Sequence, residues 1–186
     1  MARQLDETPE GVLAFWFSEW VRPQWFKATR ALDEEIRTRF LQLWRAAADG
    51  ELRSWATSPR GLLALVLVLD QFPLNMFRDR AESFSTEADA REFSHRAVEL
   101  GWDGELSAEE KAFLYLPFMH SESLPDQERS VMLYQRAGLE EGLKWARHHR
   151  ELVRRFGRFP HRNKALGRDT TPEEEVYLQS EDAFHG

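Results

Sequence analysis

A stripe of apolar residues at helical spacing is the feature that most limits what this chain can fold into. Apolar side chains recur every three or four positions over one segment, at Leu32, Ile36, Phe40, Leu43, Trp44 and Ala47. This period places them on one face of an α-helix. Gly50 follows, and glycine commonly ends helices. No segment shows the sustained alternation of a β-strand, so we expect helices throughout.

Capping signals mark where other helices begin. Thr8 and Ser58 each place a hydroxyl N-cap directly before a proline, which is favoured in the first helical turn. Ser58 precedes the longest apolar run of the chain, Leu62–Leu69. The cap and a total length of about 13 residues favour a helix over a buried strand, and we expect this helix to stop before Pro73.

The rest of the chain carries similar signals. Residues 107–110 and 171–174 have the S/T-x-x-E pattern of a capping box. Further helices are predicted from Ser85 or Thr86 to Gly101, from Pro125 towards Gly138, and from about Leu139 to near Gly157. We therefore expect an all-α fold of about nine helices, joined by short loops as antiparallel pairs, in one compact domain over residues 1–186.

Composition narrows the class of protein. With 42% hydrophobic and 31% charged residues, the sequence has the balance of a soluble globular protein. It contains no cysteine, which excludes disulfides and thiolate chemistry. No basic segment leads into an apolar stretch at its start, and its apolar runs are too short to span a membrane. We expect a cytoplasmic protein.

Charge is distributed unevenly along the chain. The net charge is −7, yet the segment Lys144–Arg168 contains nine lysine or arginine residues and one acid. The segment from Asp169 onward contains six acids and neither lysine nor arginine. The basic segment can pair with these and other acids, or it can line an electropositive cleft for an anionic ligand. We do not expect nucleic acid to bind, because the acidic remainder of the surface would repel a polyanion.

Polar residues interrupt apolar context in four short segments, at residues 69–78, 113–122, 156–163 and 166–174. Such groups need partners, because an unsatisfied buried polar group costs about 1–3 kcal/mol. They can satisfy one another, with carboxylates accepting from arginines, or they can converge on a ligand site. That site would be formed by Asp70, Gln71, Arg78, His120, Glu122, Arg158, His161, Arg162, Asn163 and Arg168.

Established catalytic patterns are absent from the sequence. There is no HExxH motif, no GxSxG nucleophile elbow and no Walker or dinucleotide glycine pattern, so we expect neither a metal nor another cofactor. Acid–base catalysis by His120 or His161 with Glu122 remains open, since an imidazole beside a carboxylate titrates near neutral pH. A histidine in such a place can equally serve as a structural donor and acceptor.

Six aromatic residues lie within twelve positions near the start of the chain: Phe15, Trp16, Phe17, Trp20, Trp25 and Phe26. We predict that they form core between the first helix and the rest of the helical array. The alternative is an exposed patch that binds a partner protein.

The strings VLAFWF, LDQFPLNMFR, FLYLPFMHSE, FGRFPHRNKALGR and DTTPEE follow one another between Val12 and about Leu178. In this order they resemble the bacterial family catalogued as domain of unknown function 924. The resemblance implies a tetratricopeptide-like α-helical superhelix and carries over no activity, ligand or catalytic residue. Leu74 stands where the family's DQFPRN pattern has arginine, so the candidate site lacks one cation. Asp169–Thr170 stands where that pattern usually has Glu/Asp-Ser.

The function predicted from these residues is that of a binding module whose polar site holds a small anionic ligand or an acidic peptide terminus. Guanidinium groups bind carboxylates and phosphates through paired hydrogen bonds, and asparagine adds orientation. An enzyme acting on such a ligand and a structural scaffold for partner proteins are the alternatives. We expect at least one carboxylate of the site to contact one of its arginines, Arg158, Arg162 or Arg168.

Overall fold

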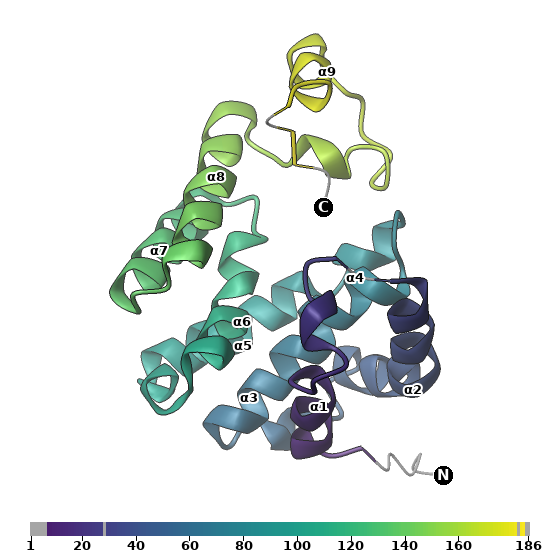
Figure 1. The fold of residues 1–186 in the computed structure, drawn as a ribbon, viewed down its shortest axis with the longest axis vertical. Helices are drawn as coiled ribbons and strands as arrows, with labels where there is room; N and C mark the ends of the chain where they lie inside the picture. Colours follow the sequence, from purple (N-terminus) through teal and green to yellow (C-terminus); the bar gives the residue numbers. More distant parts are fainter. Residues whose placement is uncertain (1–6, 28, 182, 185–186) are drawn as a thin grey trace. The chain divides into compact units, whose positions relative to one another are not determined.

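The computed structural model describes residues 7–27, 29–181 and 183–184. All regular structure in these ranges is helical, which confirms the all-α prediction (Figure 1). The α-helices are α1 (Pro9–Trp16), α2 (Arg30–Ala48), α3 (Pro59–Val66), α4 (Phe72–Met76), α5 (Glu87–Glu99), α6 (Ala108–Met119), α7 (Leu124–Arg136), α8 (Glu140–Phe156) and α9 (Pro172–Leu178). Within these ranges no helix combines the length and apolar character needed to cross a bilayer.

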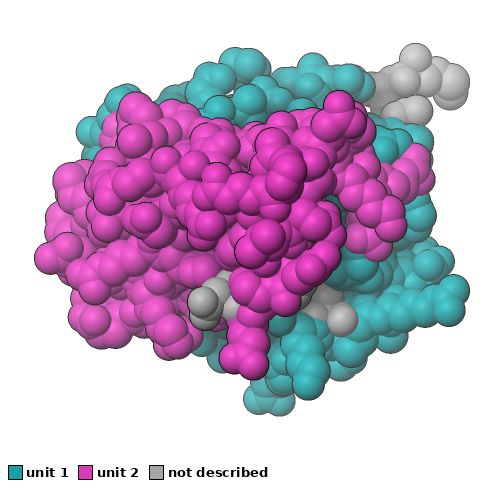
Figure 2. Space-filling view, turned by 90° about the horizontal axis from the view of Figure 1, so that it is seen from above, with its two compact units in different colours: residues 1–78, 82–117 teal, residues 79–81, 118–186 magenta. Residues whose placement is uncertain are grey.

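The chain divides into two compact units, coloured separately in Figure 2. Unit 1 comprises residues 1–78 and 82–117, with α1 to α5 and most of α6. Unit 2 comprises residues 79–81 and 118–186, with α7 to α9. A single domain over residues 1–186 and a tetratricopeptide-like arrangement of its helices stay predictions.

The predicted helix caps are present. The hydroxyl of Thr8 accepts from the backbone N–H of Gly11, and that of Ser58 accepts from Gly61, each at 3.1 Å. Both capping boxes are formed, at residues 107–110 and 171–174. Local side-chain chemistry therefore determines where these helices begin, as the sequence patterns predicted.

The expectation that the helix beginning after Ser58 stops before Pro73 is wrong. α3 continues through a π-helical turn, Leu67–Gln71, directly into α4, and every residue of Gly61–Pro73 is buried. In the π turn the N–H of Phe72 bonds to the carbonyl of Leu67, five residues earlier. Such π turns are rare and occur mostly as single turns inside α-helices, frequently at functional sites. The buried rod that results packs against α1, α2 and α5.

A side chain from another segment makes this passage through Pro73 possible. Proline has no N–H, so in a helix the carbonyl four residues earlier loses its partner. That carbonyl belongs to Leu69, and it accepts from the hydroxyl of Thr86 at 2.6 Å. The indole N–H of Trp44 in turn donates to the Thr86 oxygen at 3.1 Å. Thr86 makes no side-chain capping bond to α5; its hydroxyl instead donates to the Leu69 carbonyl and accepts from Trp44.

The N-terminal aromatic residues are core only in part. Phe15 and Trp16 are buried, and the Trp16 ring contacts Phe72 at 5.7 Å and Phe113 at 5.5 Å between centroids. Phe26 is 84% exposed and Trp20 is 49% exposed, so the prediction that all six rings are core is wrong. The exposed rings follow the end of α1, where the chain forms turns and no longer keeps one face inward.

In unit 2, α7 and α8 form a closely packed pair. They are joined by residues 137–139 and lie side by side in Figure 1. A β-carbon at Gly142 would lie 2.4 Å from the ring of Tyr134, so only glycine allows this approach of the two helices. Gly157 ends α8 with φ at 71°, a left-handed conformation that glycine adopts without strain.

Substitution of Trp16 by alanine tests the buried half of the aromatic cluster. We expect Trp16→Ala to lower the free energy of unfolding by about 3–5 kcal/mol, because it leaves a large cavity in the core. Phe26→Ala is the matched control and should change stability by only a few tenths of a kcal/mol, roughly the effect of a surface substitution. Urea denaturation of both variants provides the measurement, and equal effects would contradict the assignment.

The hydrogen bond from Thr86 to Leu69 is tested by an isosteric substitution. Thr86→Val keeps the shape of the side chain but leaves the Leu69 carbonyl buried without its donor, so we expect a loss of about 1–3 kcal/mol in stability. Thr86→Ser retains the hydroxyl and should recover most of the lost stability. If the valine and serine variants unfold at the same urea concentration, the bond does not support the helix.

Candidate functional site

The ten predicted site residues are distributed over both units. Asp70, Gln71 and Arg78 belong to unit 1, and the remaining seven belong to unit 2. Within unit 2, most of the seven lie on or beside the irregular segment 157–171, which connects α8 to α9. Two carboxylates organise this segment, one at each side.

Glu122 is the first of these carboxylates. Its two oxygens accept from Arg168 at 2.8 and 3.0 Å, and one of them also accepts from the backbone N–H of Phe159 at 2.8 Å. Burial opposes ionisation, but these hydrogen bonds and the charge of Arg162 hold the pKa of Glu122 below its usual value. The expected contact between a site carboxylate and a site arginine is therefore present as a bidentate pair.

Glu174 is the second carboxylate, and it is almost fully buried. It accepts from Arg158 at 2.6 and 2.8 Å, from Asn163 at 3.1 Å and from the backbone N–H of Thr171 at 2.8 Å. Hydrogen bonds from Arg158 are the main reason why the pKa of Glu174 falls to about 2, with the Thr171 N–H contributing. One side chain therefore completes the capping box of α9 and also fixes two residues of the connecting segment.

Ion pairs account for much of the basic segment. Besides the two bidentate pairs, Arg155 contacts Glu173, and Arg150 and Arg154 both contact Glu128 on α7. Arg158 and Arg168 also donate to the backbone carbonyls of Asp169 and Phe159. These arginines therefore pair with the acidic tail and with acids elsewhere, as one of the two interpretations of the basic segment predicted. The N–H donors in these contacts bind other parts of the same chain.

Two histidines and an arginine surround the buried ring of Phe159. The ring centroids of His149 and His161 lie 5.4 and 5.6 Å from that of Phe159, and the Arg162 guanidinium lies 4.8 Å from it. Arg162 is only 6% exposed, although it is a charged residue. Burial of an arginine among histidines creates a positive potential in a largely dry environment.

Both histidines are neutral at pH 7. Burial lowers the pKa of each to about 3, and the charges of Arg162 and His120 act in the same direction. The Nδ1 of His149 lies 2.9 Å from the carbonyl of Trp145, which can only accept, so this nitrogen carries the proton. The Nδ1 of His161 is buried and has no hydrogen-bond partner in the part of the chain that the structure describes.

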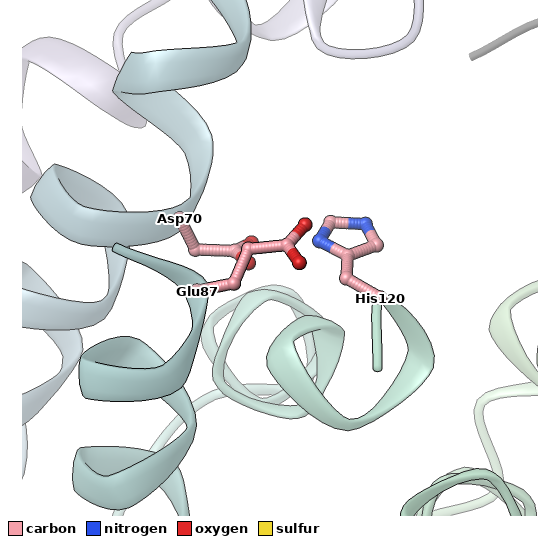
Figure 3. A group of neighbouring side chains, drawn as sticks. All are labelled: Asp70, Glu87 and His120. Carbon is pink, nitrogen blue, oxygen red and sulfur yellow. The ribbon is translucent and has the colours of Figure 1, made fainter. Parts of the chain in front are cut away.

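In unit 1, Asp70 lies in the π turn and is 1% exposed. It accepts from Gln71 at 2.6 Å, and its carboxylate lies within 4.8 Å of that of Glu87, from the first turn of α5 (Figure 3). Figure 3 also draws His120, which directly follows α6. The π turn before Pro73 contains both Asp70 and Gln71, and both residues are buried.

Arg78 has a partner that the sequence analysis did not identify. Its guanidinium donates to both oxygens of Asp33 on α2, at 3.0 and 2.9 Å, and Asn75 donates to the same carboxylate at 2.8 Å. These bonds connect the end of α4 to α2. Arg78 therefore acts as a brace within unit 1.

Several residues of these arrangements were not predicted as site residues: Asp33, Glu87, His149, Phe159 and Glu174. For His149 the sequence does hold a signal, because it falls at helical spacing with Leu143, Ala146 and Leu152 on the buried face of α8. Glu174 was recognised as a capping residue, but nothing in its spacing indicates the second role towards Arg158.

Comparison with other proteins supports the resemblance noted from the sequence strings. Residues 12–182 match the family described as bacterial protein of unknown function (DUF924). A solved structure of a protein of unknown function, ATU0120 from Agrobacterium tumefaciens, is 41% identical, and the alignment covers 92% of this chain and 96% of that chain with a TM-score of 0.87. A search of curated proteins found no match.

The buried histidines make stability depend on pH in a defined window. Their pKa is about 3 in the folded state, below the ordinary value of 6.5, so the unfolded state binds more protons between these limits. The free energy of unfolding should therefore fall as pH falls below 6.5, by about 2 kcal/mol at pH 5 for each histidine with this shift. The pKa of Glu174 is lowered to about 2 in the folded state, so this residue makes the stability depend on pH only below its ordinary pKa of 4.5.

Urea denaturation between pH 5 and 8.5 measures this dependence. His149→Gln keeps a donor for the Trp145 carbonyl but cannot titrate, so its curve should fall less steeply between pH 7 and 5 than that of the parent chain. Above pH 7.5 both histidines are neutral in both states, and the curves should run parallel. Identical slopes at acid pH would show that His149 is not held neutral by the fold.

Proposed function

The chain belongs to the DUF924 family of bacterial proteins of unknown function, and we propose that it is a binding module for a small anionic ligand. The ligand site lies in unit 2 at His161 and Arg162, beside the ring of Phe159. The ten residues predicted from the sequence thereby separate into a small set that meets the ligand and a larger set that shapes the segment 157–171.

The buried Nδ1 of His161 carries this proposal. Buried polar nitrogens are nearly always hydrogen-bonded in folded proteins, so an unpartnered one indicates a place where another molecule donates or accepts. The charge of Arg162 acts on the same ring and favours an oxygen that bears negative charge. A carboxylate or a phosphate meets both requirements, whereas a cation would be repelled.

The two carboxylate-centred networks supply preorganisation. Glu122 and Glu174 fix the segment on both sides of Arg162 through Arg168 and Arg158. A segment that is already ordered loses little conformational entropy when a ligand arrives, which improves affinity. Arg158 and Arg168 thus support the site indirectly.

Acid–base catalysis with Glu122 is less well supported by this geometry. Both oxygens of Glu122 accept hydrogen bonds from protein donors, which holds the carboxylate in its ionised form and engages it structurally. The pKa of His161 is about 3, so at pH 7 its ring is neutral, cannot serve as a general acid and is a weak general base.

A thermal-shift screen of phosphorylated and carboxylated metabolites tests the proposal. An anion at 100 times its dissociation constant should stabilise the chain by about 2.7 kcal/mol, a melting shift of roughly 5–10 °C for a protein of this size. Arg162→Ala should remove most of that shift. A screen that produces no shift in the parent chain contradicts the proposed function.

Arg155→Ala is the control for this screen. Arg155 lies near the same segment and also pairs with a glutamate, but that pair is exposed at the surface. Its variant should keep the ligand-induced shift. Arg168→Ala should lower the melting temperature without ligand, because it leaves the partly buried Glu122 without its main partner. A shift that survives Arg162→Ala would place the anion elsewhere.

A further inference from the structure

Phe184 covers both histidines of the candidate site. Its ring contacts that of His149 at 4.6 Å and that of His161 at 5.0 Å between centroids, in each case edge to face. It also contacts the ring of Trp145 at 6.0 Å. Phe184 and Ala183 pack on the small core formed by Leu152, Val153, Phe159 and Tyr177. A single phenyl ring therefore packs against both imidazoles and covers part of each.

We infer that Phe184 is a lid whose position regulates anion binding at the His161–Arg162 site. The inference rests on the proposed function. In the closed position seen here, the lid keeps the imidazoles dry and uncharged. When the lid lifts, water and the ligand reach the rings, which can then take up protons and add positive charge beside Arg162.

The groups that face these rings explain why lid opening, protonation of the histidines and anion binding are coupled. His149 faces His120, His148 and Arg162, and the Trp145 carbonyl is its hydrogen-bond partner. His161 faces Arg162, His149 and His120, and the charge of Glu122 acts on its pKa in the opposite direction. Protonation of either ring beside Arg162 and the other histidines is unfavourable unless water or an anion compensates. Lid opening supplies the water, and the ligand supplies the negative charge.

Local attachments hold the lid. The backbone N–H of Phe184 donates to the hydroxyl of Tyr177 at 2.8 Å, and Ala183 donates to the carbonyl of Ser180 at 3.2 Å. Both partners lie at or just beyond the end of α9, seven residues or fewer from Phe184. Such a short, locally anchored segment can open without disturbing the two carboxylate networks. The lid and the scaffold of the site are therefore separable.

The titration of the histidines tests the lid without any ligand. In Phe184→Ala we expect the pKa of His161, followed by NMR of its ring protons, to rise by at least one unit towards 6.5, because the ring gains contact with water. Phe184→Leu keeps an apolar cover and should titrate close to the parent chain. Val176→Ala, at a 68% exposed position of α9, is the surface control. An unchanged titration in Phe184→Ala overturns the lid.

Sulfate binding by calorimetry tests the regulation, since sulfate keeps its charge between pH 5.5 and 8. We expect Phe184→Ala to bind sulfate at least fivefold more tightly than the parent chain at pH 5.5, with proton uptake, and no more than twofold more tightly at pH 8. Equal enhancement at both pH values overturns the coupling to histidine charge. A raised histidine pKa with no sulfate binding in any variant overturns the proposed anion site but keeps the lid's control of the histidines.

Discussion

A backbone carbonyl without a helical partner is the constraint around which unit 1 is built. Pro73 lies inside the most deeply buried helix of the unit, where a free carbonyl cannot turn to water. The hydroxyl of Thr86 closes this position, and Trp44 orients that hydroxyl from α2. Three segments far apart in the sequence therefore meet at one oxygen atom. The π turn that precedes Pro73 also contains Asp70 and Gln71, so the polar residues and the irregular turn occupy the same five positions of the helix.

Unit 2 solves a related problem with charged groups. The segment between α8 and α9 forms a short 3-10 helix and several turns, and side chains satisfy further polar atoms of its backbone. Glu122 and Glu174 do this by accepting from backbone N–H groups and from arginines at the same time. Glu174, which is almost fully buried, would be costly without Arg158, and the partly buried Glu122 depends in the same way on Arg168. Arg158 and Arg168, which make these pairs, flank His161 and Arg162 in the sequence.

Much of the fold could be predicted from the sequence, because its determinants are local. Capping hydroxyls, first-turn prolines and apolar stripes act within one or two helical turns, and the predicted starts at Thr8, Ser58 and residues 107–110 are present. That the helix continues through Pro73 could not be predicted, because the hydroxyl that donates to the Leu69 carbonyl belongs to Thr86. This residue lies 17 positions away, at the start of α5. The site shows the same limit. A carboxylate–arginine contact was expected in kind, but which residues share Glu174 depends on how the segment 157–171 turns back on α9.

The tight approach of α7 and α8 has a consequence for how this family can vary. A β-carbon at position 142 and an aromatic ring at position 134 cannot occupy the same space. Natural variation at these two sites must therefore be correlated: a relative with alanine at the position of Gly142 needs a smaller residue at that of Tyr134, or a wider spacing of the two helices. Wider spacing would shift His149 on α8 relative to the segment that it packs against, so a change at a residue far from any ligand would alter the walls of the candidate site.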